Sequence, residues 1–155
     1  MNDEQDQSAT PFDDDLAELA MDSLQRLIWR LRLDQPDEWS PMLKGMVQLD
    51  LHILKLIGEK PDIILKEITT ALEIPGSTLT SAINRLEKRG TLKRVISKRD
   101  RRSYGLELTK KGWSLKNEHD RVDRMLIMKV LEALEDNQQA KTFVDMLNKI
   151  NEEFE

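Results

Sequence analysis

The most constraining feature of the chain is the order of four short elements between residues 65 and 108. Residues 65–72 have a helical period, and a second helical stretch, 77–89, follows after the break Glu73-Ile74-Pro75-Gly76. Two short helices joined by a three- to four-residue turn containing Gly have the form of a helix-turn-helix. Residues 92–96 and 104–108 then have strand character around a charged tip, which predicts a β-hairpin. This order predicts a winged helix-turn-helix.

Helical patterns on both sides of this core complete the expected organisation. Residues 1–13 are polar and acidic and are expected to be a disordered tail. We expect residues 14–155 to form a single domain, with the winged helix-turn-helix at about 46–110. Apolar residues at helical spacing predict outer helices at about 14–33 and 110–155. The expected fold class is mainly α with a small β-hairpin wing, plus N- and C-terminal dimerisation helices.

Length and composition exclude several classes of protein. A chain of 155 residues is long enough for one hydrophobic core. It has no Cys, which excludes disulfides and Cys-ligated zinc. The first residues lack the basic start and apolar stretch of a signal peptide, and no run of about 18 apolar residues exists. We therefore expect a soluble, cytoplasmic protein with no membrane segment.

The net charge of −5 hides a strong local asymmetry. Residues 77–112 contain eleven Lys and Arg but only three acids, which gives this segment +8 and leaves −13 for the rest. Attraction to phosphates needs local positive potential, so the basic segment indicates a surface for a polyanion. The alternative is an ordinary solvated surface that is rich in Lys and Arg.

Two stretches resemble the MarR family of prokaryotic transcriptional regulators. Residues 77–90, STLTSAINRLEKRG, are similar to the recognition helix of that family. Asp100-Arg101-Arg102-Ser103, followed by residues 106–112, LELTKKG, is similar to its wing motif. One departure is Pro75-Gly76, where the family more often has Ser or Thr as the helix N-cap. The resemblance covers about residues 16–154.

The second helix carries the candidate contacts to base edges. A recognition helix inserts its N-terminal residues into the major groove, where short polar side chains reach base edges or phosphates. The candidates are Ser77, Thr78, Thr80, Ser81, Asn84 and Arg85. Ser77 and Thr78 could instead cap the helix, and Ser81 and Asn84 could lie on an indifferent exposed face.

The hairpin tip carries a different kind of candidate contact. Its residues are Lys98, Arg99, Asp100, Arg101 and Arg102. A short basic hairpin fits a minor groove, and narrow A·T-rich grooves attract Arg. The family resemblance implies that Arg102 enters the groove and that Asp100 orients it through an ion pair. A solvated turn is the alternative.

The expected partners follow from the outer helices and from the resemblance. In the family these helices intertwine to form a homodimer, and a two-fold dimer reads two half-sites of a pseudo-palindromic operator in duplex DNA. The alternative is that both helices pack on their own subunit. A small aromatic effector is a further expectation from the resemblance. Its candidate pocket residues, which could equally belong to the core or the interface, are Trp29, Trp39, Met42, Met46 and Trp113.

The sequence shows no pattern typical of an enzyme or of a metal site. His52 and His119 are isolated in the sequence, and no phosphate loop or nucleophile motif is present. We expect no catalysis, no cofactor and no metal. The predicted function is a dimeric, sequence-specific DNA-binding regulator, expected to be a repressor. The alternative is a winged-helix module for protein–protein assembly without DNA contact, although such a module has no need for Arg at the tip.

Overall fold

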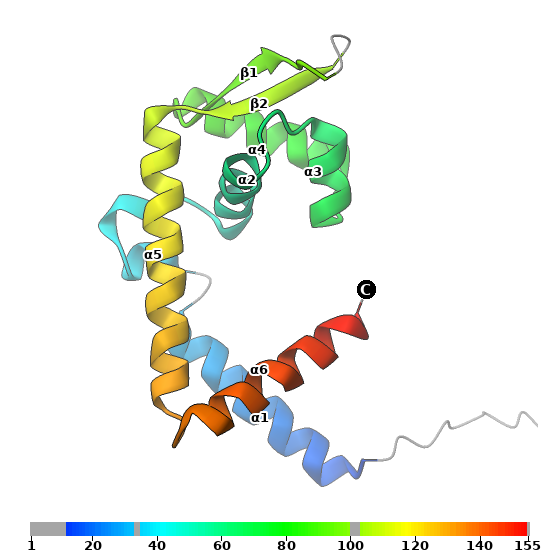
Figure 1. The fold of residues 1–155 in the computed structure, drawn as a ribbon, viewed down its shortest axis with the longest axis vertical. Coiled ribbons are helices and arrows are strands. Elements are labelled where there is room, and N and C mark those ends of the chain that lie inside the picture. The colour runs from blue at the N-terminus through cyan, green and yellow to red at the C-terminus, as the bar shows by residue number, and fades with distance from the viewer. Residues whose placement is uncertain (1–11, 33–34, 100–102, 155) are drawn as a thin grey trace, which may run out of the picture. The chain divides into compact units, whose positions relative to one another are not determined.

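A computed structural model describes residues 12–32, 35–99 and 103–154, and these are mainly helical with one hairpin (Figure 1). Two units, Met1–Leu33 and Asp34–Glu155, are described separately. The first contains α1 (Asp14–Leu31). The second contains, in order, η1 (Pro36–Glu38), η2 (Pro41–Leu43), α2 (Gln48–Glu59), α3 (Leu65–Leu72), α4 (Gly76–Lys88), β1 (Leu92–Ile96), β2 (Tyr104–Leu108), α5 (Lys110–Glu132) and α6 (Asn137–Glu152). The predicted fold class, mainly α with one β-hairpin, is confirmed.

The corner between α3 and α4 has the predicted position, but its caps differ from expectation. Glu73 ends α3 in the left-handed conformation, with φ of 51°. Pro75 precedes α4 with no side-chain cap, and its carbonyl accepts the N–H of Leu79 at 3.1 Å. The fixed φ of Pro75 therefore starts α4 without a Ser or Thr cap.

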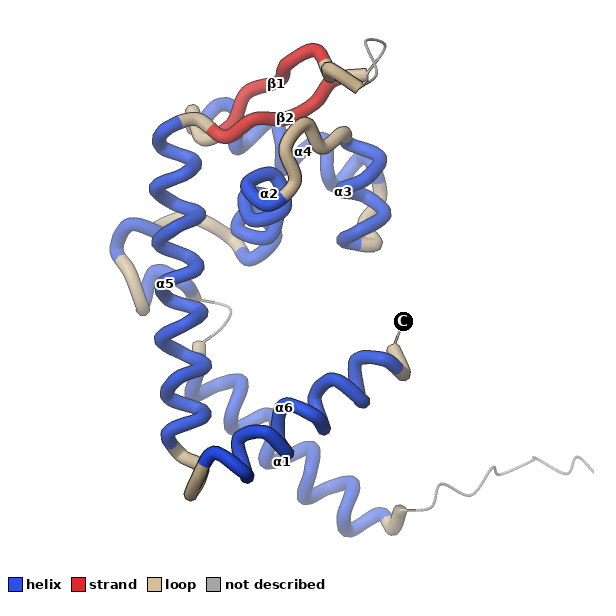
Figure 2. The backbone as a smooth tube through the Cα atoms, in the orientation of Figure 1, coloured by secondary structure: helices blue, strands red, loops and turns tan. Residues whose placement is uncertain are grey.

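A two-stranded antiparallel hairpin follows α4 directly (Figure 2). Leu92 pairs with Leu108 at its base and Ile96 pairs with Tyr104 at its outer end. Ile64 adds an isolated bridge to Gly105, and the Ile63 carbonyl accepts the N–H of Leu106 at 3.1 Å. The hairpin is therefore joined by backbone hydrogen bonds to the segment that leads into α3.

The core lies between α2, α3, α4, β2 and the first half of α5. Leu79, Ala82, Ile83 and Leu86 form the buried stripe of α4. On α2, Leu49 and Leu56 are only half-buried, whereas Asp50 and Leu51 are completely buried. A carboxylate therefore occupies a core position.

The start of α5 is fitted against the end of α4. Thr109 caps α5, with its Oγ1 accepting the N–H of Gly112 at 3.2 Å. A Cβ at Gly112 would collide with the carbonyl oxygen of Thr91. Gly112 therefore allows a close approach of two backbones.

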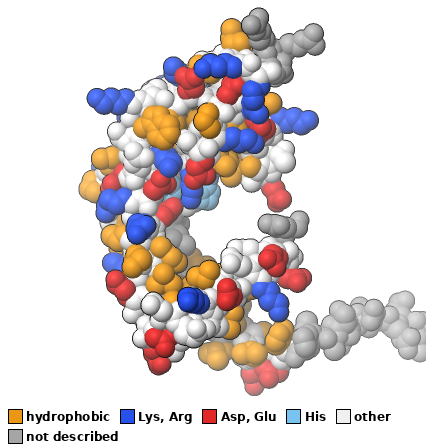
Figure 3. All heavy atoms as spheres, in the orientation of Figure 1, with side chains coloured by type: hydrophobic (Ala, Val, Ile, Leu, Met, Phe, Trp, Pro, Cys, Tyr) orange, Lys and Arg blue, Asp and Glu red, His pale blue; other side chains and the backbone are white. Residues whose placement is uncertain are grey.

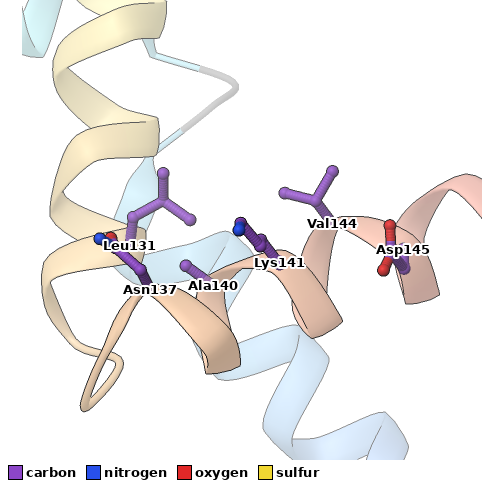
Figure 4. Close-up of a pocket in the computed structure, with 6 residues that line it drawn as sticks. All are labelled: Leu131, Asn137, Ala140, Lys141, Val144 and Asp145. Carbon is purple, nitrogen blue, oxygen red and sulfur yellow. The ribbon is translucent and has the colours of Figure 1, made fainter.

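The outer helices have apolar side chains but no buried residue. This holds for α1 and for α6, where Asp136 is the N-cap and accepts the N–H groups of Gln138 and Gln139, both at 2.8 Å. A hollow of about 310 Å³ opens between the end of α5 and α6, lined by residues that include Leu131, Ala140 and Val144 (Figure 4). Among the residues that the structure describes, no helix is long and apolar enough to cross a membrane.

Candidate nucleic-acid interface

The polar residues predicted to read DNA lie together on the exposed face of α4. Ser77, Thr78, Thr80, Ser81 and Asn84 are all exposed, opposite the buried stripe of the same helix. Ser77 and Thr78 are the second and third residues of α4, so neither is its N-cap. The Thr80 hydroxyl donates to the carbonyl of Gly76 at 2.8 Å, which leaves its oxygen lone pairs free to accept.

Arg85 lies on the same helix, but its guanidinium is hydrogen-bonded to a residue inside the protein. Its Nε donates to Oδ2 of Asp50 at 3.1 Å, and its second terminal nitrogen donates to Oδ1. The Asp50 side chain is completely buried, whereas that of Arg85 is 43% exposed. The hydrogen bond that Arg85 donates to Asp50 raises the pKa of Arg85, although burial opposes the shift. Arg85 therefore joins α4 to α2.

Asn84 and Glu87 join α4 to the hairpin through Arg94 on β1. One terminal nitrogen of Arg94 donates to Oδ1 of Asn84 at 2.6 Å, and the other lies 3.0 Å from a carboxylate oxygen of Glu87. Charge-assisted hydrogen bonds of this kind are stronger and more directional than neutral ones. The recognition helix and the wing therefore have a fixed relative placement.

Arg99, predicted as a DNA contact, is held by residues of α3 and of the loop before it, just beyond the outer end of β1. It donates to both carboxylate oxygens of Glu67 on α3, at 2.6 and 3.3 Å, and to the carbonyl of Asp62 at 2.8 Å. The pKa of Glu67 is lowered to about 2, chiefly by the hydrogen bond from Arg99 and also by those from the Ile64 N–H and Lys60. Asp100, Arg101 and Arg102 lie outside the described residues, so their predicted roles stay predictions.

Asp62 completes this attachment of the wing, which we call the wing clamp: Asp62, Glu67 and Arg99. Its Oδ2 accepts from the Ser97 hydroxyl at 2.9 Å and from the N–H groups of Lys98 and Arg99 at 3.0 and 3.2 Å. Burial opposes the shift, but these hydrogen bonds lower the pKa of Asp62. A Cβ at Gly105 would collide with Oδ1 of Asp62, so the clamp requires glycine on β2.

Internal pairing reduces the positive charge that this surface offers to a partner. Arg85, Arg94 and Arg99 are paired as described above, and Lys93 lies 2.9 Å from Glu107. Figure 3 shows Lys and Arg beside Asp and Glu around the hairpin. Among the described residues, the bases of residues 77–112 that form no ion pair are Lys88, Arg89, Lys98, Lys110 and Lys111.

The predicted effector residues do not line one pocket. Met42 and Met46 share a hollow of about 300 Å³. Its other lining residues are Lys44, Arg89, Thr91, Lys111 and Leu115. Trp113 lines a different hollow, of about 450 Å³, with residues of α2 and the hairpin.

The other two tryptophans have their own surroundings. The Trp39 ring centroid lies 4.8 Å from Nζ of Lys129 on α5, which is a cation–π contact. Trp29 lies on α1, in the first unit, with 71% of its surface exposed. The structure thus brings together two of the five predicted residues, Met42 and Met46.

The two histidines, which are isolated in the sequence, lie near one another between α2 and α5. Their ring centroids are 6.4 Å apart. His119 is buried, and its Nδ1 lies 3.4 Å from a carboxylate oxygen of Asp123. Burial lowers its pKa, and Nε2 has no hydrogen-bond partner among the residues described. No group of three or more metal-ligating side chains occurs in the described part of the chain.

Sequence reasoning missed the acidic partners Asp50, Asp62 and Glu67. A signal existed for Asp50, which stands four residues before Leu54 and seven before Ile57, at the spacing of the buried stripe of α2. The contacts of Asp62 and Glu67 with the wing carry no comparable local signal, because Arg99 lies 37 and 32 residues further along the chain.

Comparisons of the sequence with known proteins support one family. Residues 48–104 match the model of the MarR family. A stretch of 67 residues is 42% identical to the HTH-type transcriptional regulator PecS of Dickeya dadantii (strain 3937). The match covers 43% of this chain and 40% of PecS, so the chain spans less than half the length of this relative.

Solved structures share the fold over most of the chain. FabT of Streptococcus pneumoniae, in complex with DNA, superposes with a TM-score of 0.74 at 23% identity, over 92% of this chain and 100% of that chain. YusO of Bacillus subtilis gives 0.68 at 20% identity, over 91% and 98%. BpsR of Bordetella bronchiseptica, whose DNA binding is regulated by 6-hydroxynicotinic acid, gives 0.67 at 19% identity, over 92% and 98%.

The recognition helix and the wing resemble those of the MarR family, and the observed order of elements agrees with this resemblance. The family-model match across the winged core and the PecS-like stretch agree with it as well. The winged core of the chain is therefore similar to that of the MarR family.

Proposed function

We propose that the chain is a sequence-specific regulator that binds duplex DNA, with α4 in the major groove and the hairpin beside it. The MarR family model matches residues 48–104, and the similar protein PecS is an HTH-type transcriptional regulator. The observation that carries the proposal is the exposed polar face of α4, held to the wing by the contacts of Arg94 with Asn84 and Glu87. Two reading elements with a fixed relative placement can address two adjacent grooves.

A homodimer is part of this proposal, and its support is the apolar surface of the outer helices. Five apolar residues of α6 and the end of the chain are exposed, Val144, Met146, Leu147, Ile150 and Phe154. Apolar stripes without a buried residue gain stability from a partner helix. A two-fold dimer would place two recognition helices on two half-sites of an inverted repeat and act in the cytoplasm as a repressor that blocks polymerase.

A small aromatic acid is the effector class that we propose to screen. The support is the BpsR structure, which concerns regulation of DNA binding by 6-hydroxynicotinic acid. The hollow at Met42 and Met46, which Lys44, Arg89 and Lys111 also line, combines apolar and cationic side chains. Such a ligand would act by binding one arrangement of the dimer better than another.

The test is selection of bound duplexes from a random pool at near-physiological salt, because affinity for DNA depends steeply on salt. We expect enrichment of an A·T-rich inverted repeat with half-sites about 10 base pairs apart. The matched control is Arg102→Ala, which should bind the selected duplex more weakly while the dimer stays folded. Weak retention with no enriched sequence, also in the presence of candidate effectors, would contradict DNA binding and favour a protein-assembly module.

A further inference from the structure

The outer end of the hairpin presents two large apolar side chains to solvent. Ile96 is 68% exposed and Tyr104 is 62% exposed. They are direct partners in the antiparallel register, and such partners stand side by side on one face of the sheet. No described residue hydrogen-bonds to the Tyr104 hydroxyl. A contact between the two side chains stabilises the hairpin, but it does not explain why both remain so exposed.

This pair, which we call the wing shelf (Ile96 and Tyr104), lies on the face of the hairpin that is turned to the recognition helix. Side chains alternate along a strand, so Ile96 shares a face with Arg94. Arg94 contacts Asn84 and Glu87 of α4. The wing shelf therefore continues the surface formed by α4 and the hairpin.

The charges of the hairpin indicate which kind of partner this apolar surface contacts. Lys93 is paired with Glu107, Arg94 with Glu87, and Arg99 with Glu67. Of the cations in the described part of the hairpin, Lys98 alone forms no ion pair. The sequence adds Arg101 and Arg102 at the tip. The apolar pair is thus close in the sequence to Lys98, Arg101 and Arg102, and this positive charge indicates nucleic acid as its partner and not an apolar protein surface.

We propose that the wing shelf is a non-ionic DNA contact in which Ile96 and Tyr104 pack against the deoxyribose edges of the groove beside the wing. The inference rests on the proposed DNA-binding function. Sugar C–H groups offer apolar surface, and apolar side chains on DNA-binding elements pack into the minor groove. The phenol of Tyr104 keeps its polar end in water or at a phosphate. The wing then binds partly through a contact that releases no counterions.

The wing shelf should also affect which DNA base pairs the wing prefers. Guanine places an amino donor in the minor groove, whereas A·T pairs expose only acceptors there. This amino group projects into the groove, so it would hold the Ile96 side chain away from the sugar edges, whereas A·T pairs carry no such group. The shelf therefore disfavours G·C pairs at the positions that it covers.

The test compares Ile96→Thr/Tyr104→Thr with Lys98→Ala on the duplex selected by the unaltered protein. Thr keeps the strand preference and removes most of the apolar surface. We expect the double variant to lose roughly tenfold in affinity at every salt concentration, with an unchanged slope of log affinity against log salt. Lys98→Ala should reduce the magnitude of that slope, by up to about 1 if the contact is to a phosphate. Selection with the double variant should recover more G·C pairs beside the wing.

Several outcomes would overturn the proposal. Affinity of the double variant within about twofold of the parent would remove the shelf from the interface, and so would a slope change as large as that of Lys98→Ala. Tyr104→Phe keeps the ring and should bind like the parent; a loss as large as that of Tyr104→Thr would mean that the hydroxyl and not the apolar face makes the contact. Thermal unfolding of each variant separates binding from folding. A parent that retains no duplex contradicts the proposed function itself, and this inference with it.

Discussion

The guanidinium of Arg85 donates two hydrogen bonds to the carboxylate of Asp50, and this pair joins the recognition helix α4 to α2. Asp50 is completely buried, whereas nearly half of the Arg85 side chain is exposed. A buried carboxylate is tolerated only when it is paired and hydrogen-bonded. The pair therefore fixes how α4 is presented, although the sequence alone indicated Arg85 as a contact to DNA.

Arg85→Ala should destabilise the fold because it leaves the buried carboxylate of Asp50 without its partner. We expect the free energy of unfolding to fall by about 3 kcal/mol, measured by urea denaturation. In Asp50→Asn/Arg85→Ala no charge is buried, and we expect this double variant to be more stable than Arg85→Ala alone. The control is Lys93→Ala, which breaks an exposed pair with Glu107 and should cost at most about 1 kcal/mol. Equal losses for Arg85→Ala and Lys93→Ala would show that the buried pair is not important for stability.

Glu67→Ala distinguishes a clamp from a direct contact for Arg99. If Arg99 positions the wing, loss of its partner Glu67 loosens the hairpin, and both Glu67→Ala and Arg99→Ala should weaken binding to a selected duplex. If Arg99 contacts DNA, Glu67→Ala frees a cation and should strengthen binding. We expect weakening by both variants, together with faster amide hydrogen exchange in β1. Tighter binding by Glu67→Ala would contradict the clamp.

The wing clamp should weaken in acid. Glu67 has a pKa of about 2 in the folded chain, below the ordinary value of 4.5, because it accepts hydrogen bonds from Arg99 and other donors. A carboxyl whose pKa is lowered by folding stabilises the folded state above its unfolded pKa, and this contribution is lost as the pH falls through the folded pKa. The stability difference between the parent and Glu67→Gln should therefore be greatest near neutral pH and shrink between pH 4.5 and about 2. A difference that does not change over this range would contradict the assignment.

His119 should make stability depend on pH in a higher range. Burial, together with His52 and Lys55 on α2, lowers its pKa below 6.5, while Asp123 and Asp120 oppose this shift. The unfolded chain then takes up a proton first, so stability should fall as the pH drops below 6.5 towards the folded pKa. His119→Leu should reduce this dependence, measured by urea denaturation at a series of pH values. His52→Leu is the comparison, and an undiminished dependence in His119→Leu would assign the effect to other groups.

Removal of α6 should abolish the dimer. Truncation before Asp136 deletes the exposed apolar residues of α6 and is expected to give monomers or aggregates in sedimentation. Ile150→Glu is a milder version, because it places a charge on the same apolar surface and leaves the helix intact. A stable dimer from the truncated chain would mean that α6 does not lie at the interface.

Local patterns in the sequence were enough to predict most of the elements. Helix α4 and the hairpin strands were predicted at or within one residue of their observed bounds. The burial of Asp50 on α2 was not predicted. Burial of a carboxylate depends on a partner that a helical period does not reveal.

The sequence predicted which residues form the candidate interface. It did not predict which of their side chains are free to contact DNA and which are already paired within the protein. The exposed polar face of α4 follows from helical periodicity, since the stripe opposite Leu79 and Ile83 must face outward. Which of the cations are paired with acids does not follow from helical periodicity. Arg85 and Arg99 find their acids 35 and 32 residues away, on elements that only packing brings near.

The sequence by itself determined the order of helices and strands, the winged core and the basic segment, because steric preferences and side-chain periods are properties of neighbouring residues. Only the tertiary structure decided which cations are neutralised, since each ion pair depends on the distance between residues far apart in the chain. It also decided that Ile96 and Tyr104 stand together on the wing, because the register of the hairpin and the reach of the core select which apolar side chains remain in solvent.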